Sequence, residues 1–74
     1  MIRPAEYKDV AAIFRLEKEC FTDAWSEQNF LEVINSDISK MFVYESDSKI
    51  LGYAVVTVIF DEAHLDNIAV DFKA

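Results

Sequence analysis

The fold of this chain is decided by one stretch near its C-terminal end, Asp61-Glu62-Ala63-His64-Leu65-Asp66-Asn67-Ile68-Ala69-Val70-Asp71. Side chains along a β-strand alternate between the two faces of a sheet. Leu65 falls in one phase of this alternation, whereas Ile68 and Val70 fall in the other. All three can share a face only if the strand holds an extra residue, so the pattern predicts a β-bulge at Asp66-Asn67. A strand buried on both faces would need no bulge, and this alternative stays open.

Two further strands are expected before this stretch. Residues 50–60 are apolar on both sides and rich in β-branched side chains, which is typical of a central strand covered on both faces. The polar residues 46–49 predict a hairpin turn from a strand at 41–45, and a second tight turn leads into the last strand at 63–70. Gly52 indicates a bend or bulge inside the central strand.

The first half of the chain reads as a short strand at residues 2–4 followed by two helices, at 6–21 and 27–35. Ser26 is a good N-cap for the second helix. The buried side of the first helix is predicted from residues that recur at helical spacing: Val10, Ile13, Phe14, Leu16 and Cys20. Glu17 interrupts that side. The order β-α-α-β-β-β predicts an α/β (α+β) fold with a mainly antiparallel sheet.

Composition limits the classes of protein that this chain can represent. Its 74 residues make one domain at most, and 53% apolar residues are too many for a disordered segment. Cys20 is the one cysteine, which excludes an intramolecular disulfide, and no apolar run is long enough to span a membrane. Met-Ile-Arg-Pro opens no apolar signal core, so we expect a free thiol in a reducing cytoplasm.

The charge of -7 argues against two kinds of partner. Binding to nucleic acid and binding to an anionic membrane surface both need clusters of basic residues. An acidic chain can attract a basic protein, or its charge can simply keep a small domain in solution.

Several residue types capable of chemistry have an ordinary structural explanation. Cys20 lies on the apolar side of a helix, which favours a core residue over a nucleophile. Asp61-Glu62 with His64 and Asp66 is more typical of a solvated hairpin end than of a metal site, so we expect no metal. Trp25 precedes a helix cap, where it can cover the core or contact a substrate. The chain has no glycine-rich phosphate loop, because it contains a single glycine.

Three segments resemble the ribosomal-protein-alanine N-acetyltransferases, and the order of elements resembles the N-terminal half of the GNAT fold. Residues 2–5 leading into Asp9-Val10 form the first segment. The second, residues 21–27 continuing to Phe30, is similar to the family's Phe-x-x-Pro-Trp-Ser-Glu, with Ala24 in place of the proline and one extra residue. The third is residues 61–71, close to Asp-Glu-Ala-x-Leu-x-Asn-Ile-Ala-Val-Asp.

The resemblance implies transfer of acetyl from acetyl-CoA to a protein N-terminal amine, with a ribosomal protein as one acceptor. It implies that Ile68, Ala69 and Val70 line the acetyl and pantetheine end of the cofactor through main-chain atoms. N–H groups freed by a bulge suit this role, because they can stabilise the thioester oxygen as its negative charge grows. Trp25 and Asn67 are the candidates on the acceptor side.

The chain also departs from the family pattern. Residues 71–74 stop before the family's Arg/Gln-x-x-Gly-x-Gly/Ala loop, and Phe72 replaces the usual proline. No residue can be assigned as general acid or base, and the resemblance implies that both lie beyond Ala74. We therefore expect residues 1–74 to form a single partial domain that is inactive alone and binds acetyl-CoA weakly or not at all.

Two other interpretations stay open: a non-catalytic interaction module, or an enzyme completed by a separate chain. An open sheet edge and a bare apolar face further predict a homodimer.

Overall fold

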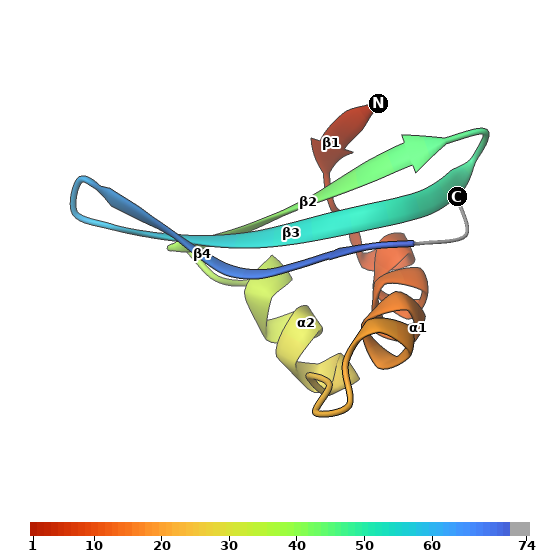
Figure 1. Cartoon of the computed structure of the whole chain (residues 1–74). Helices are drawn as coiled ribbons and strands as arrows, with labels where there is room; N and C mark the ends of the chain where they lie inside the picture. Colours follow the sequence, from red (N-terminus) through yellow and green to blue (C-terminus); the bar gives the residue numbers. More distant parts are fainter. Residues whose placement is uncertain (72–74) are drawn as a thin grey trace.

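The computed structural model describes residues 1–71, which form a four-stranded antiparallel sheet with two α-helices on one face (Figure 1). The expected end of the partial domain, from Phe72 to Ala74, lies outside the described residues. The elements along the chain are β1 (Ile2–Pro4), the 3₁₀ turn η1 (Tyr7–Asp9), α1 (Val10–Cys20), α2 (Glu27–Ile34), β2 (Ser39–Ser46), β3 (Lys49–Ile59) and β4 (Glu62–Val70). The strands lie side by side in the order β1-β2-β3-β4. The predicted order of elements and the α+β class are confirmed.

Local hydrogen bonds explain where the helices begin. The first helix was expected from residue 6, but it opens as the 3₁₀ turn η1, in which the Asp9 carboxylate accepts a hydrogen bond from the Glu6 N–H at 2.8 Å. Ser26 caps α2 as predicted, because its hydroxyl accepts a hydrogen bond from the Asn29 N–H at 3.1 Å.

The turns and sheet register agree with the sequence patterns. Asp47 and Ser48 both have positive φ, of 52° and 65°, in the predicted turn between β2 and β3. Tyr44 pairs with Gly52 but Glu45 pairs with Ile50, so β3 carries an extra residue beside Gly52, where a bend or bulge was expected.

The core lies between the two helices and one face of the sheet. Phe30 of α2 is fully buried at its centre, with its ring edge-on to Tyr53 at 5.6 Å between centroids and tilted against Trp25 at 5.3 Å. The other buried apolar residues are Val10, Ile13, Leu16, Met41, Val43, Tyr53, Val55 and Ala69. Burial of these side chains is the main force that holds the helices on the sheet.

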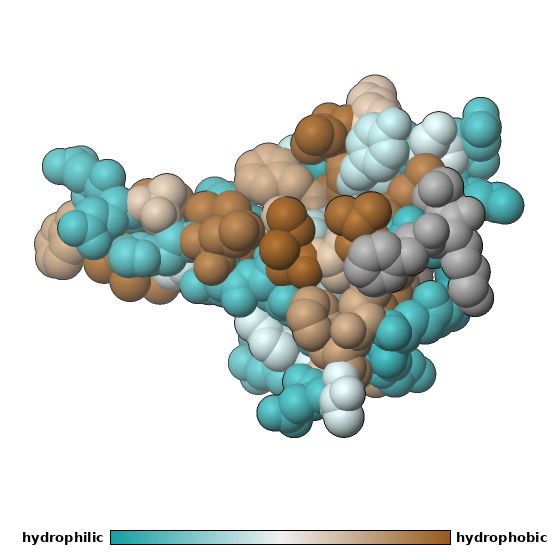
Figure 2. Space-filling view, in the orientation of Figure 1, coloured by the Kyte–Doolittle hydropathy of each residue, from teal (hydrophilic) through white to brown (hydrophobic). Residues whose placement is uncertain are grey.

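The opposite face of the sheet is apolar and uncovered among residues 1–71, and in Figure 2 apolar residues form a band along the sheet above the helices. We call this surface the open face. It holds a shallow groove of about 170 Å³, whose lining includes Ile2, Phe42, Tyr44, Gly52, Ala54, Ile68 and Val70. The expectation that residues 50–60 are covered on both faces is wrong for the described chain, because both helices pack on the same side.

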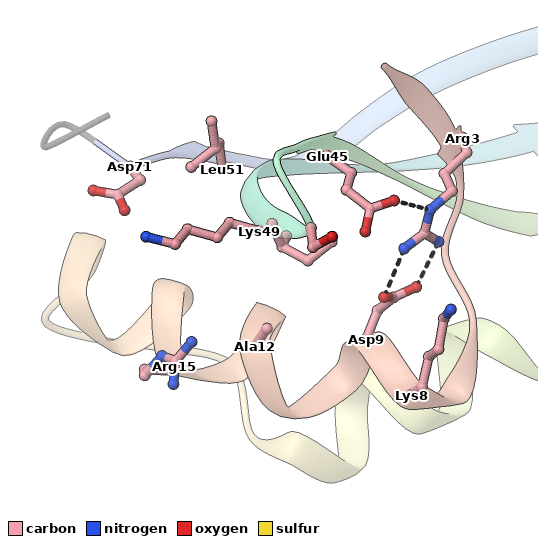
Figure 3. Close-up of a pocket in the computed structure, with 11 residues that line it drawn as sticks. Arg3, Lys8, Asp9, Ala12, Arg15, Glu45, Lys49, Leu51 and Asp71 are labelled. Carbon is pink, nitrogen blue, oxygen red and sulfur yellow. Dashed lines mark hydrogen bonds and ion pairs between the residues drawn. The ribbon is translucent and has the colours of Figure 1, made fainter.

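One arginine joins the first strand to the rest of the fold (Figure 3). The Arg3 guanidinium donates two hydrogen bonds to the Asp9 carboxylate, at 2.8 and 2.9 Å, and its Nε donates to Glu45 at 2.9 Å. Asp9 is only 5% exposed, so its charge needs this partner. The hydrogen bonds to Arg3 hold the pKa of Asp9 and the pKa of Glu45 below their usual values.

This arrangement predicts acid sensitivity. Carboxyl groups with lowered pKa values stabilise the fold above their unfolded pKa, near 4, and lose that contribution as the pH falls through the folded pKa. We expect Arg3→Gln to lower the urea midpoint at about pH 7, and this loss should shrink progressively as the pH falls below about 4 and through the lowered folded pKa values of the two acids. Arg15→Gln, on the exposed side of α1, is the matched control. An Arg3→Gln loss that does not depend on pH would contradict the role of the two carboxylates.

Candidate functional site

The register between β3 and β4 shifts by one residue near the middle of the pair. Asn67 pairs with Val55, and Leu65 pairs with Val56, so Asp66 has no residue opposite it. The predicted β-bulge is confirmed, and Asp66 is its extra residue.

The bulge places the three apolar side chains of β4 on one face. Leu65, Ile68 and Val70 all point to the open face, where they are 60%, 53% and 55% exposed. The alternative of a last strand buried on both faces is therefore wrong for the described chain.

Main-chain N–H groups of β4 face the open edge of the sheet beyond the bulge. The Asp71 N–H donates to the Leu51 carbonyl at 2.8 Å, which fixes the alternation of the ladder. By that alternation the N–H groups of Ile68 and Val70 point away from β3. No other strand of residues 1–71 lies beyond β4, so these two donors are available at the edge.

A buried carboxylate lies behind the bulge. Glu17 of α1 is 1% exposed and accepts hydrogen bonds from three separate parts of the chain. Its Oε2 accepts from the Trp25 main-chain N–H at 2.8 Å. Its Oε1 accepts from the Asn67 side-chain amide at 2.8 Å and from the Tyr53 hydroxyl. Burial, and next the hydrogen bond to Glu17, raise the pKa of Tyr53 above its usual value of 10.

A polar hollow of about 340 Å³ opens between α2 and the bulge. Trp25 lines it together with the carboxylates of Glu32 and Asp66. Asp66 accepts a hydrogen bond from the Thr57 hydroxyl, so the extra residue of the bulge contributes a carboxylate to this hollow.

The candidate residues from the sequence therefore fall into two groups. Ile68 and Val70 lie on the open face, whereas Ala69 points toward the helices and is 7% exposed. Trp25 and Asn67 are brought together, because both bond to the Glu17 carboxylate. The expectation that the general acid and base lie beyond Ala74 falls outside the described residues, so it stays a prediction.

Sequence reasoning missed Glu17 and Tyr53 as members of the site. The one available signal was the charge that interrupts the apolar side of the first helix.

Cys20 and His64 have the ordinary structural roles that the sequence favours. Cys20 packs against the core, and its thiol donates to the Val70 carbonyl at 3.6 Å. His64 lies at the exposed hairpin end, 3.2 Å from a Glu62 oxygen. Within residues 1–71 no three acids, histidines or cysteines are grouped to hold a metal ion. Neither described helix has the length and apolar character needed to cross a membrane.

A larger hollow of about 560 Å³ lies between α1 and the turn from β2 to β3 (Figure 3). Lys8, Arg15 and Lys49 surround it, but all three are exposed. Arg3, which also lines it, is already bound by two carboxylates. This hollow is therefore a solvated gap beside a structural ion pair.

Comparison with protein families matches residues 10–73 to the acetyltransferase (GNAT) family. The chain belongs to this family. The match includes both helices and the strands β2, β3 and β4 with its bulge.

Individual GNAT relatives agree. A Bacillus subtilis (strain 168) protein with the name of a ribosomal protein bS18-alanine N-acetyltransferase is 26% identical over 70 residues. The crystal structure of the ribosomal-protein-S18-alanine N-acetyltransferase from Escherichia coli superposes with a TM-score of 0.88 and 30% identity over 99% of this chain. AAC(6')-Iy, solved with the bisubstrate analogue CoA-S-monomethyl-acetylneamine, shares the fold with a TM-score of 0.80 at 16% identity.

The chain spans about half the length of the two alanine N-acetyltransferases that it matches. The match to the Bacillus subtilis protein covers 93% of this chain and 46% of that protein. It likewise covers 46% of the Escherichia coli chain.

The Tyr53–Glu17 contact predicts a sensitivity to alkali. A tyrosine with a raised pKa stays neutral in the folded chain, while the unfolded chain ionises from about pH 10. Its contribution to the free energy of unfolding is complete below that pH and is lost as the pH rises toward the folded pKa. We expect Tyr53→Phe to lower the free energy of unfolding by about 1–2 kcal/mol at neutral pH. Its stability should also fall less steeply than that of the wild type as the pH rises above about 10.

The measurement is the urea midpoint from about pH 8 to about pH 11. Tyr44→Phe, on the open face, serves as control and keeps the wild-type decline. An unchanged alkaline decline in Tyr53→Phe would show that Glu17 and burial do not hold this phenol neutral.

Proposed function

We propose that this chain is the cofactor-binding and acceptor-binding half of an N-acetyltransferase that acts on a protein N-terminal amine. The observation that carries the proposal is the bulge of β4, which presents the N–H groups of Ile68 and Val70 at an open edge. The main chain of Ile68, Ala69 and Val70 would line the acetyl and pantetheine end of acetyl-CoA. Amide groups of the pantetheine arm can pair with this edge as an added strand would.

The reaction that suits this arrangement is acyl transfer. The amine nitrogen attacks the thioester carbon, a C–N bond forms, the C–S bond breaks, and the proton lost by the amine is balanced by one gained by the CoA thiolate. Negative charge grows on the thioester oxygen during attack, and a main-chain N–H at the bulge would stabilise it. No described residue is assigned as general base or acid.

The acceptor would approach from the hollow beside Trp25. The carboxylates of Glu32 and Asp66 line that hollow, and negative charge there suits a cationic peptide N-terminus. Asn67 stands between the hollow and the edge donors. The names of the relatives favour an alanine at the N-terminus of a ribosomal protein as the acceptor.

Such an acceptor places the protein in the cytoplasm. Neither nucleic acid nor a membrane is part of this proposal, in keeping with the net charge of -7.

A titration of the ¹⁵N-labelled chain with acetyl-CoA, followed by NMR, tests the proposal. Binding is expected to be weak, because these 74 residues contain no glycine-rich phosphate loop. Shifts should be concentrated at residues 67–70. Ile68→Pro removes the outward N–H and should abolish them, whereas Ile68→Val keeps the N–H and should preserve them. Binding centred elsewhere, or binding that survives Ile68→Pro, would contradict the proposal.

The isolated chain should also show no acetyl transfer to a peptide that begins with alanine. General acid and base groups typically contribute about 10²–10⁴-fold each, and neither is assigned here. A thioester-consumption assay checks this, and turnover above background that Ile68→Pro removes would overturn it.

A second candidate function, a non-catalytic interaction module, is favoured by the open face. An apolar surface rimmed by polar residues is typical of a protein-binding site. The same acetyl-CoA titration separates the two, because a module kept for binding alone has no reason to hold the cofactor at residues 67–70.

We further propose that the chain associates as a homodimer through the open face or the β4 edge. Phe42 lies on the open face and is 37% exposed, and Ile68, on the other side of Ala54, is 53% exposed. Burial of apolar surface favours association by about 25 cal/mol per Å². At physiological salt, screening reduces the repulsion between acidic copies.

Sedimentation over a hundredfold dilution series should show a dimer that Phe42→Lys weakens. Ala11→Lys adds the same charge on the exposed side of α1 and should leave the dimer intact. A folded monomer at every concentration would refute the association.

A further inference from the structure

The Glu17 carboxylate joins the two sides of the candidate site. Its Oε1 bonds to the sheet, through Asn67 of β4 and Tyr53 of β3, and its Oε2 bonds to the connection between α1 and α2, through the Trp25 N–H. The bond to Asn67 holds the bulge that carries the proposed cofactor donors, and the bond to Trp25 holds the segment beside the proposed acceptor hollow. One rigid, planar group therefore sets the distance between them.

The way in which this charge is buried is unusual. Among residues 1–71 no basic side chain forms an ion pair with Glu17, although it is 1% exposed. Neutral donors alone satisfy it. A buried carboxylate is costly to desolvate unless its hydrogen bonds have good geometry, so each of the three donors is held firmly in place.

An apolar side chain would be the ordinary choice on the buried side of α1. The flanking residues on that side of α1, Ile13 and Leu16, are buried and apolar. Replacing a buried polar group and its partners with apolar residues of similar shape is often neutral for stability or favourable. That exchange is incomplete here, because the Trp25 main-chain N–H remains whatever residue occupies position 17, so an acceptor at this position ties α1 to the connection before α2.

Asn67 is the residue through which Glu17 reaches the bulge. It directly follows the extra residue Asp66 and directly precedes Ile68, whose N–H faces the open edge. Holding the Asn67 side chain against α1 fixes the orientation of the adjoining peptide groups. On the other side, holding the Trp25 N–H fixes the start of the segment that lines the acceptor hollow.

We propose that Glu17 is a positioning residue, which sets the bulge of β4 and the segment at Trp25 relative to one another through its two carboxylate oxygens. This inference rests on the proposed function for its meaning, but the coupling is a property of the described chain. Glu17 itself does not line the polar hollow or the groove of the open face.

Native-state hydrogen exchange, measured without acetyl-CoA, tests the coupling. The reporters are the main-chain amides of Trp25, Asn67 and Ala69, and amides of the central strands report global unfolding. Glu17→Leu should speed exchange at all three reporters by about tenfold or more beyond the global change, because a charge-assisted hydrogen bond is lost on each side.

Two conservative variants sharpen the result. Glu17→Gln keeps one acceptor oxygen, which should stay with the two donors of the sheet, so Trp25 alone should be released. Tyr53→Phe is the matched control, because it removes one donor from Oε1 and leaves the bonds to Asn67 and Trp25 intact. It should release neither segment. The single tryptophan of the chain gives an independent fluorescence signal for the Trp25 side.

Uniformly faster exchange over the whole chain in Glu17→Gln would show an ordinary stabilising contact and overturn the proposal. Equal release of Trp25 in Tyr53→Phe and Glu17→Gln would overturn it as well. If Glu17→Leu does not fold, Glu17→Gln and Tyr53→Phe still test the coupling. Failure of the acetyl-CoA titration would refute the proposed function and leave the coupling standing, so the two failures are distinguishable.

Discussion

The extra residue in β4 is the constraint on which the rest of the site depends. A shift of one residue in strand register turns every later side chain to the other face of the sheet. If Asp66 took an ordinary paired place in the ladder, Asn67 would point to the open face and Ile68 toward α1. The Glu17 carboxylate would lose a donor, and a branched apolar side chain would occupy the place beside it. The bulge, the buried acid and the apolar open face are thus parts of one arrangement.

Within residues 1–71 two carboxylates are buried, in different ways. Asp9 is balanced by a full positive charge, because Arg3 binds it with two hydrogen bonds. Glu17 is balanced by neutral donors alone. An ion pair tolerates some variation in geometry, since charge attraction falls off slowly with distance. Neutral donors must be well aligned, so the site with the stricter geometry is the one at the bulge.

Local patterns in the sequence were enough for the elements and for the bulge. Alternation between Leu65 and Ile68 is a property of neighbouring residues, and so is the cap at Ser26. Pairing across the fold is not local. The donors to Glu17 lie 8, 36 and 50 residues away from it, and nothing in their spacing identifies them as partners. The prediction that residues 50–60 are covered on both faces failed for a related reason. An apolar pattern states which surfaces should be buried and leaves open which segment covers them.

The separation between Glu17 and Asn67 also bears on how the chain folds. Their hydrogen bond closes a loop of 50 residues in a chain of 74. Contacts between residues so far apart form late, because the loss of chain entropy comes before the gain in contacts. Until β4 is in place the carboxylate keeps water, and α1 cannot pack dry against the sheet. The first helix and the last strand should therefore dock in a single step. During synthesis, the chain must have been made through Asn67 before α1 can reach its final packing.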